Sequence, residues 1–137
     1  VFDAPWELTM VGLDVTMTSL ITDEHRARLA AGGAVGRFSS DILDFYLGYY
    51  EGYTGERASG NHDALALAVA TGLVRTTLSP IVDVEVDCSD GPTRGRTVAR
   101  LEGEWGTWPD REGARHRVVM EVEPGFEDRM VDLLAGA

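Results

Sequence analysis

The sequence is poor in cysteine, in basic residues and in long apolar runs. Its 137 residues contain one cysteine, Cys88, which excludes an internal disulfide and a cysteine-based zinc site. No run approaches the roughly 18 to 20 apolar residues that span a bilayer, and no signal segment stands at the start. Lys plus Arg number 12 against 23 Asp plus Glu, a net charge of −11, which argues against a surface that follows nucleic acid phosphates. We therefore expect a cytoplasmic protein with neither a nucleic acid polymer nor a membrane as partner.

The order of patterns along the chain favours an α/β fold in one unit, residues 1–137. A domain of this length buries roughly two-thirds of its unfolded surface, which is enough for a real core. Residues 7–16, ELTMVGLDVT, are apolar and rich in β-branched side chains, as in a strand buried on both faces of a sheet. After Pro80 three alternating runs, IVDVEVDC, RTVARLEG and RHRVVMEVE, predict three further strands.

Two helices are predicted in the first half of the chain. Thr22 is a cap residue followed by an acidic first turn, which predicts a short helix that ends near Gly32. A longer helix begins at about Ser39 and is followed by a glycine-rich segment, residues 52–60, which predicts a flexible loop. Six large side chains of the longer helix share one face, because they recur at steps of three and four: Ile42, Phe45, Tyr46, Tyr49, Tyr50 and Tyr53.

Two more helices are predicted further along. Asn61 is placed to cap a helix that ends at Gly72, and residues 125–134 have helical spacing of apolar side chains. The buried stripe predicted for the first of these helices consists of Leu65, Ala68, Val69 and Leu73.

The pair His62–Asp63 stands at the first turn of that helix, and it allows two interpretations. Asp63 can simply support the helix N-terminus, where the backbone dipole favours a carboxylate, with His62 as a surface residue. Alternatively, Asp63 is a ligand for a hard cation beside a histidine that donates a proton. The dipeptide by itself does not decide between them.

Tyr46 and Tyr50 lie one turn apart, just ahead of the predicted loop. Tyrosines on the apolar stripe of a helix are usually core residues. Their position beside a glycine-rich segment keeps open a second interpretation, in which they stack on a ligand ring or donate hydrogen bonds to it.

Several motifs, taken in order, resemble the C-terminal half of the inosine-uridine-preferring nucleoside hydrolases. These are LDVT, the tyrosine-bearing helix, the glycine loop, HDALALA, TRGRTV and RVVMEVEPGFEDRMVDLL. The likeness covers nearly the whole chain. It implies the C-terminal portion of an open mixed α/β sheet flanked by helices. It also implies part of an N-ribohydrolase, which cleaves the N-glycosidic bond of ribonucleosides to give free base and ribose.

The same resemblance implies roles for the candidate residues. In the family a calcium ion at the carboxyl ends of the strands holds the ribose hydroxyls and the attacking water. By position, Asp63 resembles the calcium-ligating aspartate, and His62 resembles the histidine that protonates the departing base. Tyr46 and Tyr50 resemble the tyrosines that close over the base. We also expect a homo-oligomer, because a sheet without its further strands exposes edges and apolar faces.

The sequence departs from the family pattern in several places. The aspartate cluster of the DxDxxxDD type, which supplies most metal ligands and the general base, has no counterpart here, and neither has the EFN-type ribose segment. Met17 follows LDVT where the family often has histidine, and Ala64 follows the His-Asp pair where it often has proline. We therefore expect a fragment that is inactive alone, since one carboxylate holds calcium poorly. The alternative is a noncatalytic binding or assembly domain that keeps the fold without the site.

Overall fold

A mixed three-stranded sheet lies toward one end of the molecule in the computed structural model, which describes residues 1–137. Its order is β1–β8–β5. Strand β1 (Leu8–Val11) runs parallel to β8 (His116–Val119), and β5 (Ile81–Val82) runs antiparallel to β8. Val82, Val84 and Val118 form the buried cluster on this sheet. The open mixed sheet with flanking helices confirms the predicted fold class.

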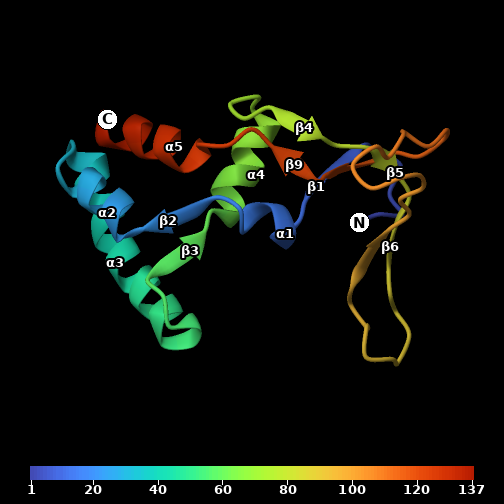
Figure 1. The fold of residues 1–137 in the computed structure, drawn as a ribbon, viewed down its shortest axis with the longest axis horizontal. Helices are drawn as coiled ribbons and strands as arrows, with labels where there is room; N and C mark the ends of the chain where they lie inside the picture. Colours follow the sequence, from blue (N-terminus) through green and yellow to red (C-terminus); the bar gives the residue numbers. More distant parts are fainter.

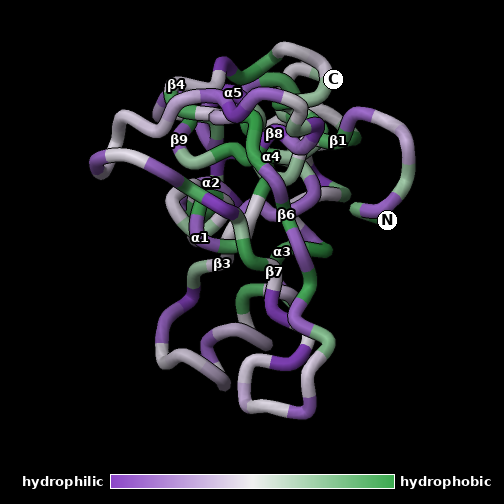
Figure 2. The backbone as a smooth tube through the Cα atoms, turned by 90° about the vertical axis from the view of Figure 1, so that its right-hand side faces the viewer, coloured by the Kyte–Doolittle hydropathy of each residue, from purple (hydrophilic) through white to green (hydrophobic).

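Three antiparallel strand pairs extend from this sheet (Figure 1). They are β2 (Leu20–Thr22) with β3 (Ala58–Gly60), β4 (Thr76–Leu78) with β9 (Glu121–Val122), and β6 (Val84–Val86) with β7 (Thr97–Ala99). The last pair belongs to a hairpin, residues 83–100, that projects from the body of the molecule and that we call the arm (Figure 1). Figure 2 shows hydrophilic residues at its tip. The base of the arm contributes Val84 to the buried cluster, whereas its tip contributes little buried apolar surface.

Three helices gather at the end of the molecule opposite the arm (Figure 1). They are α2 (Asp23–Ala30), α3 (Ala34–Thr54) and α5 (Phe126–Ala135). Their shared core consists of Ile21, Leu29, Leu47 and Val131. None of the helices combines the length and the apolar character needed to cross a bilayer.

The middle of the molecule is built on α4 (His62–Ala70), which packs between the helical end and the sheet (Figure 1). Its core cluster draws side chains from the sheet, from α5 and from the short helix α1 (Leu13–Thr16): Val15, Leu65, Ala68, Val74, Val119 and Phe126. Leu65 and Ala68 are buried as predicted, whereas Leu73 is 43% exposed. Leu73 lies beyond the end of α4 and so leaves the predicted stripe.

The strand predicted over residues 7–16 is wrong in its second half. Strand β1 ends at Val11, and LDVT forms α1, with the Val15 and Thr16 amides donating to the Gly12 carbonyl oxygen at 3.2 and 3.0 Å. The predicted burial on both faces is also wrong. Because β1 is an edge strand, most of its residues are only half-buried.

The long helix and its loop also differ from their predicted bounds. Helix α3 begins at Ala34 rather than near Ser39, and it continues to Thr54. Strand β3 takes residues 58–60 by pairing with β2, so the irregular segment between α3 and β3 shrinks to residues 55–57. Short-range sequence signals do not reveal this pairing, because Leu20 and its partner Gly60 are 40 positions apart and each strand has only three residues.

The aromatic face of α3 is turned outward. Leu47 is fully buried on the opposite face, while Phe45, Tyr49 and Tyr53 are 82%, 66% and 85% exposed. Tyr46 is 38% exposed. The interpretation of these tyrosines as core residues is therefore wrong, because α3 packs on α2 and α5 through its aliphatic positions.

Candidate functional site

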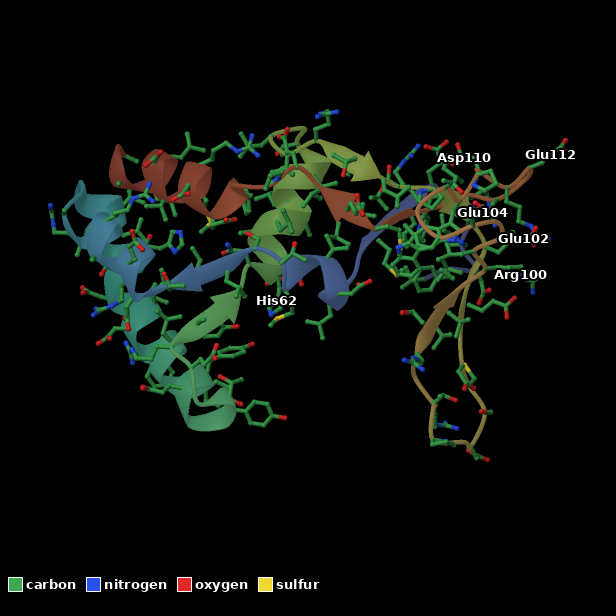
Figure 3. The ribbon with its side chains drawn as sticks, in the orientation of Figure 1. His62, Arg100, Glu102, Glu104, Asp110 and Glu112 are labelled. Carbon is green, nitrogen blue, oxygen red and sulfur yellow. The ribbon has the colours of Figure 1, made fainter.

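His62 is the first residue of α4, and its ring lies against α1. Its Nδ1 atom is 2.7 Å from the Thr16 hydroxyl oxygen, across 46 positions of sequence. The β2–β3 ladder explains the approach, because it pairs Leu20 with Gly60 and continues in the bond from the Asn61 amide to the Ser19 carbonyl oxygen, 3.0 Å. The end of α1 and the start of α4 are thereby held together. Figure 3 shows His62 in the middle of the molecule, remote from the charged residues labelled around the base of the arm.

Gly60 leaves room for the imidazole ring of His62. A β-carbon at this position would lie 2.8 Å from His62 Cε1, 3.0 Å from Met17 Sδ and 3.1 Å from the Thr16 carbonyl oxygen. Contacts this short exclude a side chain, so a glycine is needed for close approach rather than for its backbone angles. The ring therefore lies close to Gly60 and is hydrogen-bonded to Thr16. Met17, a departure from the family pattern, also lies close to Gly60.

Asn61 fixes the entry to α4 in a way that differs from the predicted cap. Asn61 does occupy the N-cap position, but its side chain does not cap the helix. Instead its buried Nδ2 donates to the Ser19 hydroxyl at 3.2 Å, and that hydroxyl donates to Glu127 Oε2 at 2.9 Å. This chain of hydrogen bonds connects α4 with α5. We call Thr16, Ser19, Gly60, Asn61 and His62 the His62 corner.

Asp63 directly follows His62, and Tyr46 and Tyr50 lie on α3, which contacts the strand β3 that leads into this corner. Asp63 is exposed, in the first turn of α4. The rings of Tyr46 and Tyr50 pack with centroids 5.1 Å apart. The pKa of the Tyr46 hydroxyl is raised above its usual value by interaction with Tyr50, by partial burial and by the negative charge of Asp63, while a hydrogen bond with Ser59 lowers it. The structure thus brings both predicted tyrosines to the end of α3 that faces β3 and Asp63.

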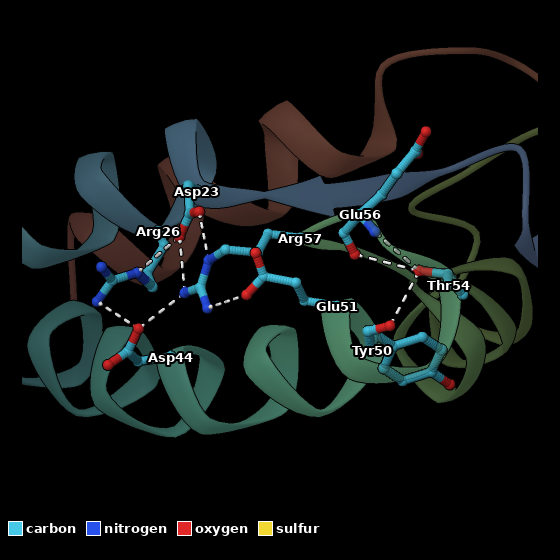
Figure 4. Close-up of polar contacts among 8 residues, drawn as sticks. All are labelled: Asp23, Arg26, Asp44, Tyr50, Glu51, Thr54, Glu56 and Arg57. Carbon is cyan, nitrogen blue, oxygen red and sulfur yellow. Dashed lines mark hydrogen bonds and ion pairs between the residues drawn. The ribbon is translucent and has the colours of Figure 1, made fainter.

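Arg57, in the segment between α3 and β3, forms ion pairs with acidic side chains of α2 and α3 (Figure 4). Its guanidinium donates to Asp23 at 2.7 Å, to Asp44 at 2.9 Å and to Glu51 at 3.4 Å. Arg57 holds the pKa of Asp23 below its ordinary value, with a smaller contribution from Arg26. These ion pairs connect α2, α3 and the strand that leads into His62.

The residues present do not by themselves fit a calcium ion. Calcium takes six to eight oxygen ligands, several of them carboxylates, whereas no three His, Cys, Asp or Glu side chains in the chain are grouped so that they could hold a metal. The acidic side chains of the arm are engaged elsewhere: Asp83 pairs with Arg111 at 3.1 Å, and Asp87 accepts hydrogen bonds from Ser89 and Thr93. Asp63 therefore stands as a single carboxylate.

Sequence reasoning singled out four residues of this region and missed the ones that hold them. His62, Asp63, Tyr46 and Tyr50 were predicted from a dipeptide, a helix pattern and a family resemblance. The hydrogen bonds of Thr16 and Ser19 join segments 42 to 108 positions apart in the chain, as the pairs Ser19–Asn61 and Ser19–Glu127 illustrate. Only the occurrence of LDVT together with GNHD gave a signal that Thr16 belongs near the site.

Solved structures define the class of fold. The purine-preferring ribonucleoside hydrolase from Gardnerella vaginalis superposes with a TM-score of 0.68 and 30% identity, over 91% of this chain and 38% of that chain. An inosine-guanosine nucleoside hydrolase gives a TM-score of 0.71 at 20% identity, over 96% of this chain and 40% of that chain, which supports the fold alone. The fold is therefore that of nucleoside hydrolases.

Sequence comparison shows the family. The chain belongs to the inosine-uridine preferring nucleoside hydrolase family, whose pattern it matches over residues 1–126. It is 36% identical over 101 residues to the inosine-uridine preferring nucleoside hydrolase of Crithidia fasciculata, covering 72% of this chain and 31% of that protein. The corresponding protein of Leishmania major is 32% identical over 125 residues, covering 90% and 37%. The chain thus spans about a third of the length of these relatives, and the predicted resemblance is confirmed.

Proposed function

We propose that this chain supplies the leaving-group side of a ribonucleoside N-ribohydrolase site. His62 protonates the departing base, Tyr46 and Tyr50 contact the base, and Asp63 provides one carboxylate to a calcium ion. The observation that carries the proposal is the His62 corner, where a half-buried imidazole is hydrogen-bonded at Nδ1 and directly precedes Asp63, whose charge acts on Tyr46 of the tyrosine pair. Family membership supplies the substrate class, purine or pyrimidine ribonucleosides.

The chemistry explains why an imidazole is needed there. When the N-glycosidic bond breaks, its electron pair moves to the base nitrogen and the sugar carbon becomes oxocarbenium-like. A base that leaves as an anion is a poor leaving group, so a proton delivered from His62 lowers the barrier. Imidazole suits this task because it exchanges protons near neutral pH. Water then adds to the anomeric carbon and gives up a proton.

Asp63 is the only residue of this chain that we propose as a calcium ligand. Because Asp63 stands alone, a calcium site that uses it needs further oxygen ligands from outside these 137 residues. We therefore propose that the chain by itself is inactive as a hydrolase. A cytoplasmic location, a homo-oligomeric state and a single folding unit over residues 1–137 stay predictions.

The proton-donor role is tested by His62→Ala in a full-length enzyme that contains this chain. We expect turnover of a ribonucleoside to fall by about 10² to 10⁴-fold, the usual contribution of general acid catalysis. An aryl riboside whose leaving group needs no proton should lose far less. His25→Ala is the matched control, because His25 lies in α2 and bonds to Thr22 at its own helix start. Equal losses on both substrates would exclude the role.

The metal proposal is tested on the chain alone by calorimetry with calcium. We expect a dissociation constant of about 1 mM or weaker, since high-affinity calcium sites use many more oxygen ligands. Asp63→Asn should abolish the residual binding, and Asp90→Asn, which changes a fully exposed carboxylate of the arm, should leave it unchanged. Micromolar binding by the unaltered chain would contradict the claim that Asp63 acts without partners here.

A second candidate function is a noncatalytic binding or assembly domain. The observation that favours it is the exposed aromatic face of α3, where Phe38, Phe45, Tyr49 and Tyr53 are each more than 60% exposed, since apolar faces of this kind often mark contacts with other proteins. The substrate comparison for His62→Ala separates the two functions, because an assembly domain has no turnover that depends on His62.

A further inference from the structure

The Thr16 hydroxyl has two hydrogen-bond partners. It lies 2.7 Å from His62 Nδ1 and 3.2 Å from the Leu13 carbonyl oxygen. Thr16 is 3% exposed, at the end of α1. Water therefore has little access to this hydroxyl, and its hydrogen bonds are those made within the protein.

One arrangement of protons satisfies both contacts. A hydroxyl carries a single proton, and the Leu13 carbonyl oxygen only accepts. Thr16 therefore donates to Leu13, and its oxygen accepts from an N–H at His62 Nδ1. In the opposite arrangement Thr16 donates to Nδ1, and the contact with Leu13 brings two acceptors together. The first arrangement makes two hydrogen bonds and the second makes one, so the first is favoured.

The same arrangement suits both protonation states of the ring. In the imidazolium, both nitrogens carry protons, and Nδ1 must donate. When Nε2 loses its proton, the bonds from Nδ1 to Thr16 and from Thr16 to Leu13 remain in place. On one side the ring also lies close to Gly60, where a β-carbon would stand 2.8 Å from Cε1. Proton transfer at Nε2 thus requires no rearrangement around Nδ1.

We propose that Thr16 is a positioning residue that fixes the neutral His62 ring as the Nδ1–H tautomer and so makes Nε2 the nitrogen that exchanges its proton. The inference rests on the proposed function in one respect, namely that the Nε2 proton goes to the departing base. In that step the electron pair of the N-glycosidic bond moves to the base nitrogen, which takes the Nε2 proton. His62 is left neutral, with Nδ1–H still bonded to Thr16, and solvent restores the Nε2 proton.

The tautomer is measurable in the chain without substrate. Long-range ¹H–¹⁵N spectra distinguish a protonated from an unprotonated ring nitrogen, and the three histidines of the chain are assigned with His62→Gln, His25→Gln and His116→Gln. In spectra of the neutral ring, we expect a protonated Nδ1 and an unprotonated Nε2 for His62. An unprotonated Nδ1 in the unaltered chain would overturn the inference, whatever the variants do.

Two substitutions at position 16 test whether the Thr16 hydroxyl is what fixes the tautomer of His62. Thr16→Val keeps the shape and removes the hydroxyl, so His62 should shift to the Nε2–H tautomer. Thr16→Ser keeps the hydroxyl and should keep the Nδ1–H tautomer. A purely structural role of Thr16 predicts no difference in tautomer between the valine and serine variants. If Thr16→Val does not fold, the unaltered chain and Thr16→Ser still decide the assignment.

Kinetics in the full-length enzyme separate this inference from the proposed function. Thr16→Val should lower kcat for a ribonucleoside roughly 10- to 100-fold, as expected for a residue that orients a functional histidine, with little change for an aryl riboside. Thr16→Ser should retain most of the activity. If the tautomer is as expected while His62→Ala leaves turnover intact, the proposed function fails and the tautomer assignment stands. If His62→Ala behaves as a proton-donor variant while Nε2 carries the proton, the present inference alone fails.

Discussion

The His62 corner and the arm differ in how their polar side chains are held. In the corner, hydrogen bonds join residues 42, 46 and 108 positions apart, between Asn61 and Ser19, Thr16 and His62, and Ser19 and Glu127. In the arm, the polar bonds of Asp87 and Arg94 reach partners no more than six positions away. The corner residues are mostly buried, whereas nearly all residues from 85 to 98 are exposed.

The contrast shows that ionisable groups alone do not make a site. Figure 3 labels a concentration of charged residues around the base of the arm, including Arg100, Glu102 and Asp110. These groups pair within their own loops or cap strands: Glu102 binds Arg111 at 2.8 Å, and Asp110 accepts from the Ile81 amide at 2.7 Å. The corner has fewer charges, but its imidazole is packed and hydrogen-bonded by distant segments. Catalysis requires functional side chains that are held in a fixed geometry.

The largest expected difference between the His62 corner and the arm is the loss of stability when an apolar side chain is truncated. Leu65 is fully buried beneath the His62 corner, whereas Val98 of the arm is 51% exposed. Leu65→Ala should lower the free energy of unfolding by about 2 to 5 kcal/mol, because it removes buried methyl groups and leaves a cavity. Val98→Ala should change it by about 0.5 kcal/mol or less. Denaturant unfolding measures both, and equal losses would mean that the arm contributes to the core as much as α4 does.

A smaller difference in stability is expected between alanine substitutions at Gly60 and at Gly91. In Gly60→Ala the new methyl group meets the His62 ring at 2.8 Å, while in Gly91→Ala it meets only the Ser89 hydroxyl, at 3.3 Å. The former should cost about 1 to 3 kcal/mol through overpacking, and it should move the imidazole resonances of His62. The latter should leave both the stability and the spectrum of His62 nearly unchanged. An unaltered His62 spectrum in Gly60→Ala would show that Gly60 does not position the ring.

The smallest effect concerns acid stability. The pKa of Asp23 is lowered by Arg57 and that of Asp87 by Ser89 and Thr93. A lowered carboxyl pKa contributes stability above the ordinary value and loses it as the pH falls through the folded-state value. The Asp23 contribution should therefore be complete above about pH 4 and disappear below it. Arg57→Gln should return the pKa of Asp23 toward normal and leave Asp87 unaffected, as ¹³C titration of the carboxyls would show.

Much of the local structure could be predicted from the sequence. The Thr22 start of α2, the His62 start of α4 and the Gly125 start of α5 were each marked by short-range signals. These features depend on the backbone propensities and caps of neighbouring residues. The alternating runs after Pro80 are strands as predicted, but they form five short strands, β5 to β9, where three were expected. The family resemblance followed from the same ordered motifs.

The unpredicted features depend on distant partners. Strands β2 and β3 have three residues each and exist because they pair with one another. The aromatic face of α3 is exposed because the opposite face of the helix packs on α2 and α5. Apolar residues occur on both faces of α3, so the sequence pattern does not predict which face is buried. The sequence alone determined where α2, α4 and α5 start, the acidic character and the set of residues available for chemistry. Only the tertiary structure decided that Thr16, Gly60 and His62 meet, because contacts between segments far apart in the chain follow from packing and not from local propensity.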